Sequence, residues 1–318
     1  MNRFIVRRIL QIVPQLAILL VLSFALVHLT PGQTGVLDLE SADSQNITAL
    51  REMLGLDRPL HEQFGDWALR LLQFDFGVSF IDGQPVIEKI LERLPPTLLL
   101  TGSALLLSLL LAVPLGIVSA LRRNTPVDYG LTLFAFVGIS VPAFWAAILA
   151  IIAFGVMIPV LPIQGMRTVG APVANEFLDV AKHLILPAAI LGLEGTAALT
   201  RYVRSSMIEA LVEDYIRTAR SKGLRERVIV LRHAMKNALL PAVTILGLRL
   251  PMLVGGAVLI EAVFAWPGIG RLGLEAVLRR DYPVVMGLVV FTGVLTIVGN
   301  LLADLAYGLL DPRIKQGA

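Results

Sequence analysis

The chain has 318 residues, of which 56% are hydrophobic and 16% are charged, and its mean hydropathy is +0.78. Soluble domains carry about 45–50% apolar and about 25% charged residues, so this composition excludes an ordinary soluble protein and favours one polytopic membrane domain. The net charge of +3 is too small to indicate a nucleic-acid partner, and the absence of cysteine excludes disulfides and thiolate metal sites.

The first apolar stretch covers residues 9–29 and follows three arginines. It is longer than the apolar part of a usual signal peptide and no small-residue cleavage pattern follows it, so a retained membrane-spanning helix is favoured over a signal peptide. At roughly 20 residues per span, five more windows give six predicted spans, at 97–121, 130–160, 183–202, 239–263 and 283–307. In the third of the six, Pro142 and Pro159 predict a kink or an end, because proline removes a backbone donor.

The segment 30–96 separates the first two spans and carries its own helical signals. Asn46 can cap a short helix that runs to Met53, and residues 60–73 repeat apolar side chains at helical spacing. We therefore predict a small structured cap rather than a flexible linker.

Lysine and arginine are more than twice as dense in the loops predicted on the same side of the membrane as the N-terminus as in the loops on the other side. The positive-inside rule then places both termini in the cytoplasm and the segment 30–96 outside. The chain divides into 1–29 (N-terminus and first span), 30–96 (extracytoplasmic cap), 97–306 (membrane core with a cytoplasmic loop at 201–238) and 307–318 (cytoplasmic tail).

The cytoplasmic loop 201–238 is patterned as two helices. Residues 207–222 place apolar side chains at helical spacing with charges between them, and Gly223 predicts the end of that helix. Residues 225–237 resume as a second basic amphipathic helix. Three interpretations stay open for this loop: an anchor at anionic lipid headgroups, a solvated connection, or a docking element for a soluble partner.

Sequence motifs for catalysis are absent. The chain contains no G-x-x-x-x-G-K-[ST] loop for a nucleoside triphosphate, no H-E-x-x-H zinc motif and no G-x-S-x-G nucleophile elbow. Enzyme activity and a cofactor or metal of its own are therefore not expected.

Three charged residues, Glu194, Arg249 and Asp304, lie inside predicted spans, where a charge indicates a cavity or a partner. Glu194 and Arg249 either pair beside a translocation path or reach water independently. Small residues at 192, 196 and 200 form a stripe suited to close helix packing, from which Glu194 points away.

Thr296, Asn300 and Asp304 repeat at a spacing of four and form a polar stripe, which either lines the path or bonds neighbouring helices. Trp266 beside Pro267 predicts an aromatic anchor at the outer membrane interface.

Six segments and the loop together resemble a known family: MLGLDRPLHEQF (53–64), DFGVSFIDGQPV (75–86), ERLPPTLLL (92–100), FAWPGIGRL (264–272), RDYPVV (280–285), LLDPRIK (309–315) and EDYIRTARSKGLRERVIVLRHAMKNALLP (213–241). The chain resembles the first permease of the dipeptide, oligopeptide and nickel ABC importers. The resemblance implies an all-α, six-span permease that pairs with a second permease in the cytoplasmic membrane of a bacterium or archaeon. It further implies two ATPase subunits that hold ATP and magnesium, and a substrate-binding protein outside.

The resemblance also implies a role for one part of the loop, the helix that couples the permease to an ATPase. The matching positions are Tyr215, Ile216, Arg217, Thr218, Ala219, Arg220, Lys222 and Gly223, with Arg217 in place of the motif's glutamate. Peptides are the implied cargo, with nickel, glutathione or another small solute as alternatives. An ion-coupled transporter that uses Glu194 or Asp304 is the rival from another class, and an intramembrane hydrolase is a third.

Overall fold

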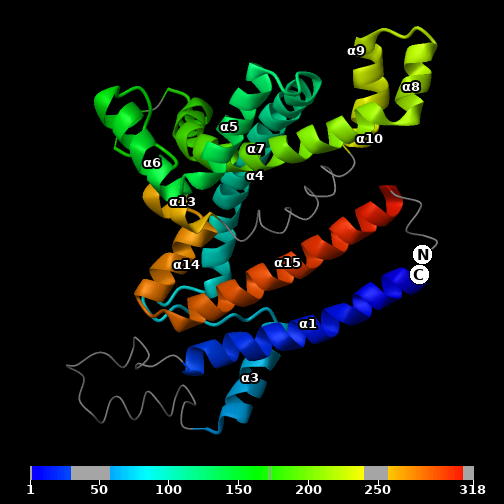
Figure 1. Cartoon of the computed structure of the whole chain (residues 1–318). Coiled ribbons are helices and arrows are strands. Elements are labelled where there is room, and N and C mark those ends of the chain that lie inside the picture. The colour runs from blue at the N-terminus through cyan, green and yellow to red at the C-terminus, as the bar shows by residue number, and fades with distance from the viewer. Residues whose placement is uncertain (1, 30–57, 171, 173, 240–256, 311–318) are drawn as a thin grey trace. The chain divides into compact units, whose positions relative to one another are not determined.

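The computed structural model of the protein describes residues 2–29, 58–170, 172, 174–239 and 257–310 (Figure 1). All regular elements in these ranges are helical, as the sequence predicted; a single bridge pairs Val78 with Pro85. The elements are α1 (Asn2–Leu29), α3 (Leu60–Leu72), α4 (Val86–Leu121), α5 (Pro126–Ser140), α6 (Ala143–Ile151), η1 (Ile152–Met157), α7 (Glu176–Val212), α8 (Asp214–Ser221), α9 (Glu226–Val228), η2 (Ile229–Ala234), α10 (Met235–Ala238), α13 (Val258–Val263), α14 (Ile269–Leu278) and α15 (Tyr282–Leu310).

Three helices in the described ranges are long and apolar enough to cross a membrane, namely Val86–Leu121, Glu176–Val212 and Tyr282–Leu301 of α15. A fourth span results if α5 and the helix after it count as one broken span, and α1 contributes the shorter apolar stretch Leu10–Ala25. Most of the predicted window 239–263 lies outside the described residues. Six spans therefore stay a prediction.

The predicted kink in the third window is confirmed. α5 ends at Ser140, the next helix begins directly after Pro142, and the two helical segments differ in direction by 97°. Val141 takes an extended conformation because the residue before a proline is sterically excluded from the helical region. Since proline also lacks the amide hydrogen, Pro142 ends one helix and starts another.

The chain forms two compact units, Met1–Pro95 with Gly268–Ala318, and Pro96–Pro267. In the first unit, the start of α4 packs on α14 and α15 through a core that includes Val86, Ile90, Ile269 and Leu272. A polar clip fixes the loop before α4, because the buried carboxylate of Asp281 accepts hydrogen bonds from the Ser79 hydroxyl at 2.5 Å and the Phe80 amide at 3.0 Å.

The second unit contains most of α4, together with α5 to α13, and its helices meet at glycine positions. A Cβ added at Gly192 of α7 would stand 3.0 Å from the carbonyl oxygen of Ala104 on α4, and the hydroxyl of Ser108 donates to the Gly192 carbonyl at 2.7 Å. Thr196 and Thr200 are buried on the same helix. The small-residue stripe is thus confirmed as a close-packing seam.

Gly116 of α4 makes a second close approach to α7, and we expect Gly116→Ala to lower the free energy of unfolding by about 1–3 kcal/mol, as overpacking does. The new Cβ would stand 2.7 Å from Cβ of Val203 and 3.0 Å from the Thr200 carbonyl oxygen. Thermal unfolding of the protein in detergent measures the change. The matched control is Gly102→Ala on the same helix, where no atom lies within 4 Å of the added Cβ. There we expect a gain of up to about 1 kcal/mol from helix propensity; equal losses at both positions would contradict the close-contact argument.

Of the two helices predicted within 30–96, the second is confirmed as α3 (Leu60–Leu72). The first, from Asn46 to Met53, lies outside the described residues.

Candidate functional site

The loop after α7 begins with a break that the sequence did not predict. Periodicity indicated one helix over 207–222, but α7 ends at Val212 and α8 starts at Asp214. Glu213 between them is extended (φ −67°, ψ 152°), and its carbonyl accepts the amides of Ile216 at 3.0 Å and Arg217 at 3.3 Å. Glu213 therefore acts as the N-cap of a separate helix. A single helix over 207–222 was wrong.

The predicted end of α8 at Gly223 is confirmed. Gly223 has φ +73°, a left-handed conformation that glycine adopts without a steric penalty, and its amide donates to the Arg220 carbonyl at 2.9 Å. The chain then returns through α9, η2 and α10, and η2 packs against α8. The second predicted helix, 225–237, is thus present, with a π-helical segment inside it.

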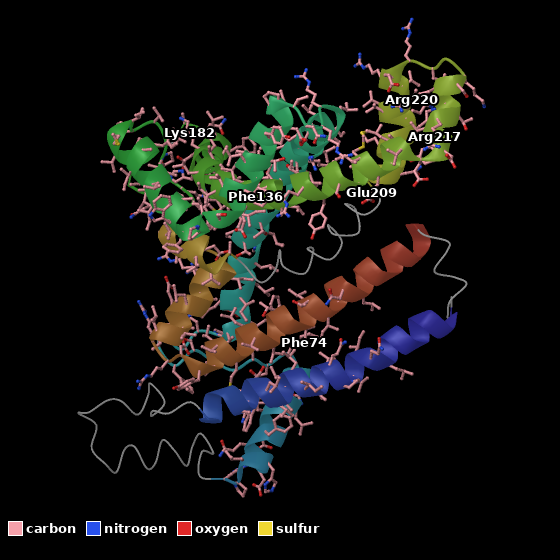
Figure 2. All side chains as sticks on the ribbon, in the orientation of Figure 1. Phe74, Phe136, Lys182, Glu209, Arg217 and Arg220 are labelled. Atoms are coloured by element: carbon pink, nitrogen blue, oxygen red, sulfur yellow. The ribbon has the colours of Figure 1, made fainter. Side chains whose placement is uncertain are left out.

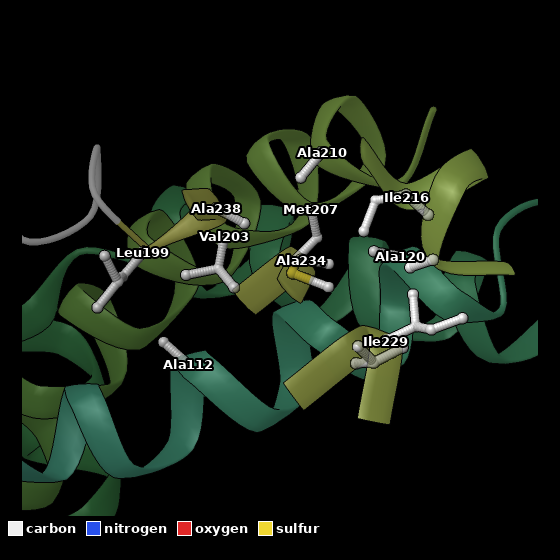
Figure 3. Packing of buried hydrophobic residues seen from close by; sticks show 12 residues of the cluster. Ala112, Ala120, Leu199, Val203, Met207, Ala210, Ile216, Ile229, Ala234 and Ala238 are labelled. Atoms are coloured by element: carbon white, nitrogen blue, oxygen red, sulfur yellow. The ribbon is translucent and has the colours of Figure 1, made fainter. Parts of the chain in front are cut away.

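α8 rests on a core of its own chain. Ile216 is 0% exposed and Ala219 is 5% exposed, in one cluster with Ala120 of α4, Met207 of α7 and Ile229 of η2 (Figure 3). The remaining members of this cluster are Ala112, Leu199, Val203, Ala210, Val230, Ala234 and Ala238. Ile216 and Ala219 are therefore not available to a partner; they attach α8 to α4 and α7.

The opposite face of α8 is open. Six of the eight matching positions are exposed: Tyr215, Arg217, Thr218, Arg220, Lys222 and Gly223. Figure 2 labels Arg217 and Arg220 on this helix. Arg217 Nη1 lies 3.2 Å from Asp214 Oδ1, and Arg220 Nε lies 2.7 Å from Glu226 Oε1, which raises the pKa of Arg220. Both pairs are solvated and so contribute little to stability, which leaves the two guanidinium groups available to acidic groups of a partner.

A buried ion pair beside this loop was not predicted from the sequence. Asp128, in the first turn of α5, is 2% exposed and accepts Nε of Arg204 at 2.7 Å and Nη2 at 2.9 Å. The hydroxyl of Ser119 on α4 donates at 2.5 Å and the amide of Asn124 at 3.0 Å. One carboxylate thus ties the end of α4, the start of α5 and α7 together, eight residues before α7 ends.

Of the predicted pair Glu194 and Arg249, the structure describes only Glu194. Glu194 is exposed on α7, away from the buried stripe of Gly192 and Thr196, as the sequence predicted. Arg249 lies outside the described residues. The pairing therefore stays a prediction.

The polar stripe on α15 is partly described. The Thr296 hydroxyl donates to the Thr292 carbonyl of its own helix at 2.8 Å, and Asn300 is exposed. Asp304 belongs to α15, but its side chain lies outside the described part of the chain. The Thr296 bond is intrahelical, so the two interpretations of the stripe stay open.

The structure corrects the role of Trp266. The sequence predicted an anchor at the membrane interface, but its side chain is 0% exposed and its indole Nε1 donates to the Pro96 carbonyl at 2.9 Å. Glu261, equally buried, accepts the Thr97 hydroxyl at 2.9 Å and was missed because its partner lies 164 positions away in sequence. Both residues stabilise the second unit.

The first unit contains a small charged groove, lined by Asp82, Lys89, Glu92, Arg93, Glu275 and Arg279 among others. Lys89 Nζ lies 2.5 Å from Asp82 Oδ2 and lowers the pKa of that carboxyl group. Within the described ranges, no cluster of His, Asp and Glu side chains could hold a metal ion.

Two family matches cover nearly the whole chain. Residues 112–316 match the family described as the binding-protein-dependent transport system inner membrane component, and residues 1–101 match the corresponding N-terminal family.

Full-length relatives agree with these matches. The oligopeptide transport system permease protein AppB of Bacillus subtilis (strain 168) is 40% identical over 319 residues, which cover 99% of this chain and 100% of AppB. A putative peptide permease protein of Brucella suis biovar 1 (strain 1330) is 42% identical over 321 residues, and the glutathione transport system permease protein GsiC of Salmonella choleraesuis (strain SC-B67) is 41% identical over 317 residues; both alignments cover 99% of each chain. The chain therefore belongs to the inner-membrane components of binding-protein-dependent transport systems, the permeases of ABC importers.

Proposed function

We propose that this chain forms, with a second permease of the same type, the membrane path of an importer for di- or oligopeptides. AppB is an oligopeptide permease and the Brucella relative is a putative peptide permease, which supports a peptide cargo. GsiC keeps glutathione, itself a tripeptide, as the alternative. Nickel and other small solutes stay further alternatives.

The partners follow from the same proposal. A substrate-binding protein delivers the cargo from outside, and two ATPase subunits bind ATP and magnesium and hydrolyse the ATP, so this chain contributes no catalytic residue. The density of Lys and Arg supports cytoplasmic termini in the inner membrane of a bacterium or archaeon.

The observation that carries the proposal is the two-sided nature of α8. Tyr215 and Arg217 on α8 and Lys222 at its C-cap are exposed and available to an ATPase, while Ile216 packs into the core shared with α4 and α7. A displacement of α8 by the ATPase is therefore passed to α4 and α7 through packed side chains, and to α5 through Asp128 and Arg204. Such packed elements move as units between discrete states.

Co-purification tests this docking. We expect Arg217→Glu with Lys222→Glu to abolish recovery of the ATPase subunits with the tagged permease. Both changes replace a positive by a negative charge, on the exposed face of α8 and at its C-cap, where the proposal expects acidic groups of the ATPase. Arg123→Glu with Arg227→Glu is the control, since it makes the same change of charge at exposed positions outside α8. If the α8 variant retains the ATPase as the unchanged protein does, α8 is not the docking element.

A transport assay separates the proposal from its rival. In vesicles that contain the complete complex, peptide uptake should require ATP on the side of the membrane that carries the ATPase subunits. Uptake should persist in the Glu194→Gln variant. Uptake that runs on an ion gradient without ATP, and that Glu194→Gln abolishes, would instead establish the ion-coupled transporter.

A further inference from the structure

The helix α3 is attached to α1 by a cluster of aromatic rings. The ring centroid of Phe24 on α1 lies 5.4 Å from that of Phe64 in an edge-to-face arrangement, and 5.8 Å from that of Trp67. The ring centroids of Phe64 and Trp67 are 6.1 Å apart. These contacts fix the position of α3 along α1 at the level of Phe24.

That level lies near the end of the predicted membrane span of α1. The apolar residues 9–29 of α1 extend over about 31 Å at 1.5 Å per residue, which equals the roughly 30 Å thickness of the hydrocarbon core. Phe24 stands five residues before Leu29, or about 7 Å inside the end of that span. Amphipathic helices that lie in a membrane surface bury their apolar face to about 5–10 Å, so α3 is held at the depth where such helices lie.

The apolar face of α3 is only partly covered by the protein. None of the side chains of α3 is fully buried within the described part of the chain. Leu60 is 58% exposed at the start of the face that carries Phe64 and Trp67, and Leu72 is 77% exposed at the end of the helix, about 80° around it from Phe64. Glu62 and Asp66 occupy the opposite side of the helix, as the 100° turn per residue requires.

Phe74, just beyond α3 and labelled in Figure 2, is a further exposed apolar side chain. It is 79% exposed and has φ +60°, a conformation that residues other than glycine rarely adopt. The amide of Phe74 donates to the Leu71 carbonyl at 3.0 Å, and the next amide donates to Arg70 at 3.0 Å. The turn that ends α3 thus holds a large apolar ring away from the rest of the chain.

We propose that α3 lies in the surface of the bilayer and buries Leu60, Leu72 and Phe74 among lipid acyl chains. Lipid is the occupant that the position favours, because Phe64 and Trp67 hold α3 against Phe24 of α1, and α1 is a predicted membrane span. The charges around α3 are balanced, with Glu62 and Asp66 against Arg58 and Arg70. Apolar burial therefore drives the association, with no preference for anionic lipid.

The protein contains no cysteine, so single cysteines can report on α3 in the complete transporter reconstituted in lipid discs. The probe variant is Leu72→Cys and the matched control is Glu62→Cys on the polar side, each labelled with a fluorophore that is sensitive to water. We expect emission at shorter wavelength from the Leu72→Cys label and a loss of its fluorescence when lipids with nitroxide-labelled acyl chains are included. The Glu62→Cys label should show neither effect, and both results should be the same in neutral and in anionic lipid.

Two outcomes would overturn the proposal. In the first, both labels emit as in water and escape the nitroxide lipids, so α3 projects into solution. In the second, the Leu72→Cys label emits as in water when the transporter is in lipid discs, and its emission shifts to shorter wavelength only when the substrate-binding protein is added. This face is then a protein interface.

Discussion

Arg204→Ala is expected to destabilise the protein by about 3 kcal/mol, because it leaves the carboxylate of Asp128 buried without its counter-ion. Asp128 is 2% exposed and receives two hydrogen bonds from this one guanidinium group. The arginine side chain is 30% exposed, which places the expected loss at the lower end for a buried pair. The midpoint of thermal unfolding in detergent, compared with that of the unchanged protein, measures the effect.

The control for Arg204→Ala is Arg201→Ala on the same helix. Arg201 lies 5.0 Å above the ring of Phe136, and losing that contact should cost only about 0.5–1 kcal/mol. A rescue variant isolates the cause: Asp128→Asn combined with Arg204→Met leaves no charge buried and still accepts the Ser119 hydroxyl. If this double variant is no more stable than Arg204→Ala, the unpaired carboxylate is not the source of the loss.

Ile216→Asp is expected to separate α8 from the body of the protein and to abolish ATP-driven uptake. The side chain is 0% exposed in the cluster with Met207 and Ala120, and burying an unpaired carboxylate there costs several kcal/mol. The helix should detach rather than bury the charge. Amide exchange over Asp214–Ser221 should then become fast, whereas the amides of α7 keep their protection.

Ile216→Val is the conservative control. It keeps an apolar side chain in the same site and should cost only about 0.5–1.5 kcal/mol, with uptake retained. The measurement is the ratio of peptide molecules imported to ATP molecules hydrolysed. This ratio should fall to zero in Ile216→Asp and not in Ile216→Val. Unchanged exchange and unchanged uptake in Ile216→Asp would show that the contact of α8 with the core does not transmit movement.

Local sequence signals predicted the elements that local physics determines. The turn at Gly223 needs a positive φ, the proline at 142 cannot continue a helix, and the spacing of Phe64 and Trp67 is that of an amphipathic helix. Each depends on neighbours within a few residues, so a single sequence is enough to find it.

The features that were missed depend on contacts between distant parts of the chain. Asp128 meets Arg204 across 76 positions, and Trp266 reaches Pro96 across 170. Nothing in the surroundings of either residue distinguishes a buried polar group from an exposed one. The break at Glu213 was missed for a different reason, since glutamate is a good helix former and the apolar spacing continues across it.

The length of α7 gives it a mechanical consequence. Its 37 residues extend about 55 Å at 1.5 Å per residue, well beyond a hydrocarbon core of about 30 Å. Pro187 within it removes one backbone hydrogen bond, so a bend of α7 would be expected at this residue and would make it the pivot. From that pivot to Val212 the lever arm is about 38 Å, so a rotation of about 5° would carry the base of α8 through about 3 Å. A small rotation of α7 within the membrane would therefore move its far end by a distance comparable to an atomic diameter.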